Sequence, residues 1–491
     1  MLTKHPRHPI YQALWIGFVI AVGMVVGILV GVRPRLLAAA FVSVLTVTVF
    51  FRYFEYTVLG LLILRTSLDL FSKQGIPALF AIGLDGLILL YVVYKTLTGQ
   101  RVQTDQFFWF FAGWVALQSL WVILLPLGGL GLGTAQLSAG LREWVRIASW
   151  VMIYLLVTQL RGKIHPEKVA SALFLSLATP LSAALIQLLI PPSALPTWLV
   201  FKGDATDELT FEVGSRISGT LGHPNGFAKV LILFIALTWW KLDYAKKRSG
   251  WILLLSVLIF FLTTTKSLFS LGMFGVFIVA FGAQRLNLPK FIGGILLFVL
   301  FIALFASSEF GQERLASIAN TPLLNPDIDA SRAIILSEGN SFNWRIAQWT
   351  YLLEAWRHYP WLGYGLQSSA VLTVFTNYAH NDYVRVLAEE GIVGLAVYLV
   401  FWVVQLLRLF YLMRSSSATN AQRSLCAVLI ALGLAILLGM STDNVWSNTV
   451  FFFYWWTLSA VVGWDWRSSA LEETSPTPSI QHSNKYAREA D

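Results

Sequence analysis

Charge and cysteine are both scarce in this chain of 491 residues. Aspartate, glutamate, lysine and arginine together make up only 12% of it, against about 25% in soluble globular proteins. A soluble globular domain is therefore excluded. The single cysteine, Cys426, lies inside an apolar run, so neither a disulfide framework nor a cysteine-based metal site is expected. Apolar sequence dominates instead, with 56% of the residues hydrophobic.

Histidine is also sparse, and no second or third histidine stands at the spacing of metal ligands. We therefore expect no metal and no cofactor. The net charge of +9 comes largely from basic loops between apolar runs. Such loops report membrane orientation, so no nucleic-acid partner is expected.

Long apolar runs recur along the chain, each long enough to cross a hydrocarbon core of about 30 Å. The run at 55–71 is the weakest, because Arg65 and Asp69 stand near its end. These runs predict an all-α integral membrane protein, a multi-span helical bundle with 12 to 14 transmembrane helices. The predicted spans are 11–32, 35–51, 55–71, 77–94, 107–126, 144–159, 168–190, 226–240, 251–265, 267–284, 291–306, 392–411, 424–441 and 447–464.

Basic residues fall in alternate loops between these spans, which places those loops in the cytoplasm by the positive-inside rule. Two polar segments, 191–222 and 307–378, then face the opposite side together with the short turns at 263–267 and 441–447. The hairpin at Arg33 and Arg35 disagrees with this orientation, while the later loops agree with one another. The loop residues that set the orientation are Lys95, Arg101, Arg161, Lys163, Lys168, Lys241, Lys246, Lys247, Arg248, Arg285, Lys290, Arg408, Arg414 and Arg423.

Arginine dominates the basic residues on the outward side. A guanidinium binds phosphate through two parallel hydrogen bonds and stays charged, whereas lysine acts as a point charge. The simpler interpretation is that most of these arginines are solvated or paired with nearby acids. The outward basic residues are Arg142, Arg146, Arg216, Arg314, Arg332, Arg345 and Arg357, with Lys202 and Lys266 as the two lysines.

Arg345 departs most from the solvated interpretation. The stretch 343–359 has helical periodicity, with Phe342, Ile346, Trp349, Leu353 and Trp356 on one stripe, and Arg345 falls inside that apolar arc. Asn343 is a predicted N-cap, which places the arginine in the first helical turn, where anions are favoured and cations are not. A phosphate would complete such a site. An arginine that snorkels from an interfacial helix explains the pattern equally well.

His380 stands where the second polar segment returns to the membrane. Asn381 is a predicted cap of a short helix that runs to Glu390 and ends at Gly391. A histidine just outside a helix start can accept a proton near neutral pH, although a lone histidine is more often structural. His223 competes for this role, but glycine and proline beside it already explain a tight turn.

Three motifs of this sequence resemble motifs of the O-antigen ligase and O-antigen polymerase superfamily. The resemblance covers residues from about Arg216 to Gly394, and the order of its elements is specific. The motifs are Gly219-Thr-Leu-Gly222-His-Pro224-Asn225-Gly-Phe-Ala228, then Asn343-Trp-Arg345 with Pro360-Trp-Leu-Gly363-Tyr-Gly365, and last His380-Asn381-Asp382-Tyr383 followed by Glu390-Gly391-Ile-Val-Gly394.

The resemblance implies a bacterial inner-membrane glycosyltransferase of the GT-C type with its active site facing the periplasm. Such enzymes move a glycan from undecaprenyl diphosphate to an acceptor hydroxyl on a glycan or on lipid A-core, without a metal. By the same resemblance, Arg216 and Arg345 bind the diphosphate and His380 is the catalytic base or orients the acceptor. Lys266 stands where the family commonly has an arginine. The supporting residues are Asn225, Asn381, Asp382 and Tyr383.

The predicted organisation follows from the spans and loops. It comprises an N-terminal transmembrane bundle at 1–190, a first periplasmic loop at 191–223, central transmembrane helices at 224–306, a large periplasmic loop with amphipathic helices at 307–391, C-terminal transmembrane helices at 392–466 and a disordered cytoplasmic tail at 467–491.

Two other classes of function stay open. A transporter or flippase for an anionic lipid-linked solute would carry ionisable residues inside its spans, but Asp85 is the one clear mid-span acid and has no symmetric partner. A non-catalytic envelope scaffold explains the spans and leaves both polar segments without a purpose. Ligase and polymerase use the same donor and differ in the acceptor, so the sequence does not separate them.

Overall fold

The structure is a computed structural model that describes residues 34–124, 134–201, 216–285, 288–309, 311–313, 316, 341–373 and 378–467. The chain forms two compact units, Met1–Val58 and Leu59–Asp491, and all site residues discussed below belong to the second. The predicted span at 11–32, the outward residues Lys202, Arg314 and Arg332, and the tail from 468 onward lie outside the described residues.

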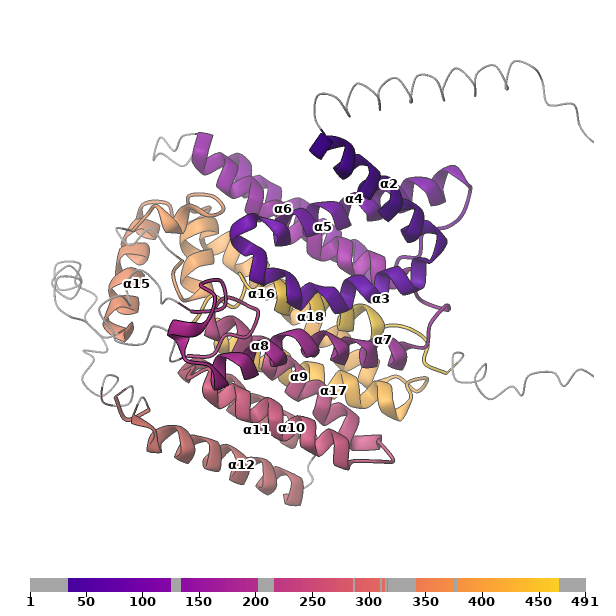
Figure 1. Ribbon diagram of the computed structural model, residues 1–491. Helices are drawn as coiled ribbons and strands as arrows, with labels where there is room; N and C mark the ends of the chain where they lie inside the picture. Colours follow the sequence, from indigo (N-terminus) through magenta and orange to yellow (C-terminus); the bar gives the residue numbers. More distant parts are fainter. Residues whose placement is uncertain are drawn as a thin grey trace, which may run out of the picture. The chain divides into compact units, whose positions relative to one another are not determined.

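Every regular element in the described ranges is helical, which confirms the all-α prediction (Figure 1). The α-helices are α2 (Pro34–Arg52), α3 (Phe54–Leu64), α4 (Ile76–Leu97), α5 (Gln106–Leu124), α6 (Thr134–Thr158), α7 (Pro166–Ala172), α8 (Ala178–Leu189), α9 (Pro224–Tyr244), α10 (Ser249–Thr264), α11 (Leu268–Arg285), α12 (Leu288–Ser307), α15 (Ser341–His358), α16 (Asp382–Arg414), α17 (Asn420–Gly439) and α18 (Thr449–Val461). Short 3₁₀ helices are η1 (Arg65–Gln74), η3 (Leu173–Leu177), η4 (Pro192–Ala194) and η5 (Ser368–Ala370).

Six described helices are long and apolar enough to cross a membrane, or up to seven if one bent pair counts as a single span. The protein is therefore a multi-span membrane protein. Four shorter apolar helices, of 10–17 residues, follow the same pattern. The predicted count of 12 to 14 transmembrane helices also included these short helices and the run at 11–32. It is therefore larger than the six or seven spans that length and composition support in the described residues.

The weak span predicted at 55–71 changes into a 3₁₀ helix at its charged end. In η1, Arg65 Nη1 lies 2.7 Å from Asp69 Oδ1, and Arg65 Nη2 donates to Thr449 Oγ1 at 2.8 Å. The guanidinium is buried, so it needs partners of this kind. The two charges that weakened the prediction are thus satisfied inside the protein.

Helix α18 forms the centre of the second unit. All its side chains from Val450 to Val461 are buried, as expected for a helix that is apolar all round. It packs against α6, α7 and α9, while α17 lies beside α9, α11 and α16 (Figure 1). Aromatic rings tie the centre together: Trp150 lies 4.7 Å from Trp446 and 4.6 Å from Phe452 between ring centroids. Each such pair adds about 0.5–1.5 kcal/mol beyond burial.

A break in α16 positions the start of that helix. Gly391 has φ +69°, and a Cβ atom there would lie 2.3 Å from the carbonyl carbon of Trp361. Only glycine tolerates both the left-handed backbone and this close approach. Ile392 N donates to Pro360 O at 2.9 Å across the break. The predicted end of the short helix at Gly391 is confirmed, and its cause is the segment that docks there.

Candidate active site

The N-terminal end of α9 carries the first group of predicted site residues. His223 caps the helix, because its Nδ1 accepts the backbone N–H of Asn225 at 3.0 Å. A ring nitrogen used as a cap has a structural role. His223 is therefore explained by the turn, in line with its lower rank as a candidate base.

The side chain of Asn225 contacts residues from two loops, one carrying Arg216 and the other carrying Ser267. Arg216 Nη2 donates to Asn225 Oδ1 at 3.0 Å, and Ser267 Oγ donates to the same oxygen at 2.9 Å. Arg216 Nε also donates to the carbonyl of Thr265 at 3.0 Å. The guanidinium is half-buried and fixed in direction. The structure thus brings Arg216 and Asn225 together with the turn that carries Lys266.

Lys266 is one of three non-glycine residues with positive φ in the described chain, at +49°. A second is His380, at +47°, and the third is Gln367. A β-carbon makes this backbone region unfavourable by about 1–2 kcal/mol per residue, and such strain concentrates at functional sites. Two residues predicted for the site from sequence are therefore also held in a conformation that the surrounding structure imposes.

His380 faces a carboxylate in the turn between α17 and α18. Its Nδ1 lies 3.2 Å from Asp443 Oδ1, and its ring packs edge-on against Trp344 with centroids 5.3 Å apart. An ionised carboxylate can only accept, so Nδ1 carries the proton. The lone pair of the neutral ring then resides on Nε2, which is the tautomer that a general base requires.

Asp443 has a second partner, the ammonium of Lys229 on α9. Lys229 Nζ lies 2.8 Å from Asp443 Oδ2 and donates to Asn444 O at 3.0 Å. Both side chains are at most 5% exposed. Burial alone raises the pKa of the Asp443 carboxyl, but the Lys229 charge and the His380 hydrogen bond outweigh it and hold that pKa well below its usual range.

One turn of α9 connects the two polar clusters. Asn225 and Lys229 are four residues apart, so they share a face of the helix with about 5–6 Å between their Cβ atoms. The turn that holds Asp443 is tied to the same helix, because Asn448 Nδ2 donates to Gly226 O at 3.3 Å. The guanidinium of Arg216 and the imidazole of His380 are thereby attached to adjacent parts of one scaffold.

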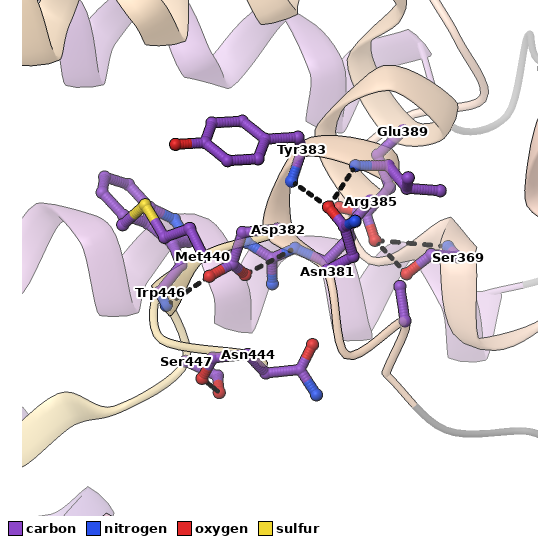
Figure 2. A network of polar contacts seen from close by, with 12 residues as sticks. Ser369, Asn381, Asp382, Tyr383, Arg385, Glu389, Met440, Asn444, Trp446 and Ser447 are labelled. Carbon is purple, nitrogen blue, oxygen red and sulfur yellow. Dashed lines mark hydrogen bonds and ion pairs between the residues drawn. The ribbon is translucent and has the colours of Figure 1, made fainter. Parts of the chain in front are cut away.

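The first residues of α16 form hydrogen bonds with the turn between α17 and α18. Asn381 Oδ1 accepts the backbone N–H groups of Tyr383 and Val384, both at 3.0 Å, which confirms the predicted cap. Figure 2 shows Asp382 between two segments of the turn: its N–H donates to Met440 O and its Oδ2 accepts from the backbone N–H of Trp446, each at 2.8 Å.

Tyr383 adds a contact with α17, because its hydroxyl donates to Leu437 O at 2.7 Å. Asn381, Asp382 and Tyr383 therefore support the site by their backbone and side-chain contacts with residues 437–446. They hold His380, which immediately precedes them, against Asp443.

Further buried charged side chains lie on α16 and α6. Arg385 Nη1 lies 3.7 Å from Glu143 Oε1, and Arg146 pairs with Glu143 while donating from Nη1 to Trp446 O at 2.8 Å. Figure 2 also shows Glu389, whose Oε1 accepts from Ser369 Oγ at 2.5 Å. Arg146 was expected among outward arginines, and the structure gives it a structural partner.

Helix α15 begins at Ser341, two residues before the predicted cap at Asn343, so that prediction is wrong. Arg345 consequently lies in the second turn and not at the helix N-terminus. The predicted stripe is also rotated: Leu353 is exposed, while Gln348 and Leu352 are fully buried. Arg345 precedes them by three and seven residues, so it lies on the buried face, and it is half-buried.

The other outward arginines divide as the simpler interpretation suggested. Arg357, near the end of α15, is 68% exposed and pairs with Glu354 at 2.7 Å. Arg142 is exposed on α6. These two arginines lie at the surface, in contrast to Arg216 and Arg345.

Lys229, Asp443 and Ser267 are the site residues that sequence reasoning missed. Lys229 stands inside the predicted span 226–240, and a charged residue within a span marks a functional site by default. That signal was present in the sequence. Asp443 lies in a short turn between spans, and nothing in its neighbours distinguished it before the fold brought it to His380.

Among the residues that the structure describes, no three histidine, cysteine, aspartate or glutamate side chains are grouped so that they could hold a metal ion. The carboxylates of the candidate site lie against lysine, histidine and arginine side chains.

Residues 251–399 match the family model of the O-antigen ligase. The matched segment contains Lys266, Arg345 and His380, whereas Arg216, Lys229 and Asp443 lie outside it. No curated protein matches the chain. Members of the matched family are glycosyltransferase-like enzymes, and the match supports a ligase-like or polymerase-like function. The match covers residues 251–399, so this part of the chain is similar to the O-antigen ligase family.

Proposed function

We propose that the protein transfers a glycan from undecaprenyl diphosphate to an acceptor hydroxyl on the periplasmic side of the bacterial inner membrane. The acceptor is either lipid A-core or the end of a second glycan. The observation that carries the proposal is that one turn of α9 holds both groups: Asn225 contacts the guanidinium of Arg216, and Lys229 contacts Asp443, which in turn contacts the imidazole of His380.

The reaction divides between these two groups. The acceptor oxygen attacks the anomeric carbon of the donor sugar, and its proton passes to Nε2 of His380. The bond from that carbon to the diphosphate oxygen breaks, and the electron pair leaves with the diphosphate. Arg216, with Lys266 and Arg345, stabilises the charge that develops on the leaving oxygen.

Each of these two roles has a typical contribution to the rate of an enzyme. A preorganised cation or hydrogen-bond donor at developing charge contributes about 10²–10³ in rate. A positioned base contributes about 10²–10⁴. The guanidinium of Arg216 is held by Asn225 and by the carbonyl of Thr265, so little reorganisation is needed when the donor arrives.

The same residues support a GT-C type mechanism without a metal. The diphosphate is already an activated leaving group, and the cationic side chains supply the charge that a divalent ion would otherwise provide. Asn225, Asn381, Asp382 and Tyr383 hold the cations and the imidazole in place through the contacts described above.

The test is glycosyl transfer by the purified full-length protein in liposomes that contain an undecaprenyl-diphosphate-linked glycan and one acceptor. We expect transfer by the wild-type protein and a loss of about 10²-fold or more for His380→Ala, Arg216→Ala and Arg345→Ala. Arg357→Ala is the matched control, because it removes an exposed arginine from the same helix as Arg345.

Two results would overturn the proposal. If His380→Ala and Arg345→Ala keep full transfer activity, the assignment of the site is wrong. If the wild-type protein moves the lipid-linked glycan across the bilayer and forms no glycosidic bond, the protein is a flippase. Transfer to lipid A-core identifies a ligase, and elongation of the lipid-linked glycan identifies a polymerase.

A further inference from the structure

Three ionisable side chains form a line that ends at the candidate base. Lys229 contacts one oxygen of the Asp443 carboxylate at 2.8 Å, and His380 contacts the other at 3.2 Å. Lys229 has no place in the proposed transfer reaction, and its ammonium is engaged by Asp443, by Asn444 O and by the ring of Phe269 at 5.2 Å. Its connection to His380 therefore runs through Asp443.

With a neutral His380, the charge of Asp443 is balanced only if Lys229 is present. A buried carboxylate requires a compensating positive charge, because an isolated ion in an apolar environment is strongly disfavoured. Lys229 supplies that charge, so the imidazole can remain neutral beside Asp443. Without Lys229, the remaining source of compensation on Asp443 is a proton on His380.

The other charged groups around Asp443 do not provide this compensation. Asp382, at the start of α16, interacts electrostatically with both Lys229 and Asp443, and it carries negative charge in its ionised form. Arg385 Nε lies 3.7 Å from Asp382 Oδ1 and supplies positive charge to that carboxyl group, so Asp382 and Arg385 leave the charge of Asp443 to Lys229. Among the contacts of the described residues, Lys229 on α9 and His380 before α16 bring a positive or basic group directly against this carboxylate.

We propose that Lys229 is a positioning residue that keeps His380 unprotonated, by balancing the charge of Asp443, and so maintains the base in its active form. This inference depends on the proposed function for its catalytic meaning. The alternative is that Lys229 and Asp443 form a purely structural ion pair, in which case the protonation of His380 does not depend on Lys229.

The experiment compares Lys229→Met with Lys229→Arg and with Lys241→Met in the full-length protein. Lys241 is a second buried lysine on α9 and pairs with Glu167 away from His380, so Lys241→Met reports the loss of a buried ammonium alone. Two quantities are measured against pH: the rate of glycosyl transfer and the acylation of His380 by diethyl pyrocarbonate, which requires an unprotonated ring nitrogen. Peptide mass spectrometry quantifies the labelled residue.

We expect Lys229→Met to move the acid limb of the pH–rate profile upward by about 1–3 pH units, the size of effect that one neighbouring charge exerts. The labelling midpoint of His380 moves upward by the same amount. Lys229→Arg keeps both values near those of the wild type, because the charge is retained. Lys241→Met changes neither, whatever its effect on melting temperature.

The proposal is overturned if Lys229→Met lowers activity or stability while both pH profiles stay where they are in the wild type. It is also overturned if Lys241→Met shifts them equally. Labelling of His380 needs no substrate, so it decides the role of Lys229 even if the wild-type protein fails to transfer a glycan. That failure would contradict the proposed function alone.

Discussion

Helix α9 carries a buried lysine near each end, and the two are used differently. At the N-terminal end, Lys229 pairs with Asp443, which is 4% exposed and also contacts His380. At the C-terminal end, Lys241 lies 2.6 Å from Glu167 Oε1, and that carboxylate is 37% exposed. The same residue type on the same helix therefore meets a fully buried acid at one end and a half-exposed acid at the other.

The surroundings of the two ammonium groups explain the difference. Lys241 lies 4.7 Å from the ring of Trp240, 5.6 Å from Tyr244 and 6.0 Å from Trp251, so aromatic faces share in stabilising its charge. Glu167 keeps contact with solvent and needs little from the protein. Lys229 instead meets a carboxylate that depends on protein groups alone. The pair at Lys229 therefore differs from the pair at Lys241 in that its acid also contacts a histidine.

Of the substitutions that test this comparison, neutralising Asp443 should have the largest effect on stability and on glycosyl transfer. Asp443→Asn leaves the Lys229 ammonium buried without a counter-charge, which typically costs about 3–5 kcal/mol. The amide also ceases to define the tautomer of His380, so we expect transfer to fall by about 10²-fold or more. Thermal unfolding and the liposome assay measure the two effects. An unchanged melting temperature would contradict the assigned burial of this charge.

The pH dependence of that destabilisation has a defined sign. The Lys229 and His380 contacts lower the pKa of Asp443 in the folded protein, whereas the unfolded chain has a pKa of about 3.9. The carboxylate therefore stabilises the fold fully above the unfolded pKa, and this contribution is lost as the pH falls through the folded pKa. The difference in free energy of unfolding between wild type and Asp443→Asn should be constant above about pH 5 and shrink at lower pH.

Substitution of Gly391, at the break that positions the start of α16, should have the next largest effect on the free energy of unfolding. Gly391→Ala places a methyl group 2.3 Å from the carbonyl carbon of Trp361 in a left-handed backbone. We expect a loss of about 2–5 kcal/mol in free energy of unfolding, the sum of backbone strain and overpacking. Gly86→Ala on α4 is the control, because its Cβ would meet nothing within 4 Å. Equal melting temperatures for the two variants would show that the docked segment is loose.

The sequence predicted more of the fold than of the site. Apolar runs located most helices, since burial in lipid and burial in the protein both require apolar side chains. The motifs drew attention to Arg216 and His380 as candidates, and they predicted the break at Gly391. They could not reveal Asp443, because its partners come from positions more than 60 residues away along the chain. The rotation of α15 also escaped prediction, since Gln348 is polar and yet fully buried.

Neutralising the acid at the far end should have the smallest effect. Glu167→Gln keeps the shape of the side chain and removes a charge that is 37% exposed, while the rings of Trp240, Tyr244 and Trp251 remain around Lys241. Because solvent already screens this carboxylate, we expect a loss of about 1 kcal/mol in free energy of unfolding. Glycosyl transfer and its pH profile should match the wild type. A loss of transfer as large as that of Asp443→Asn would show that both ends of α9 serve the reaction.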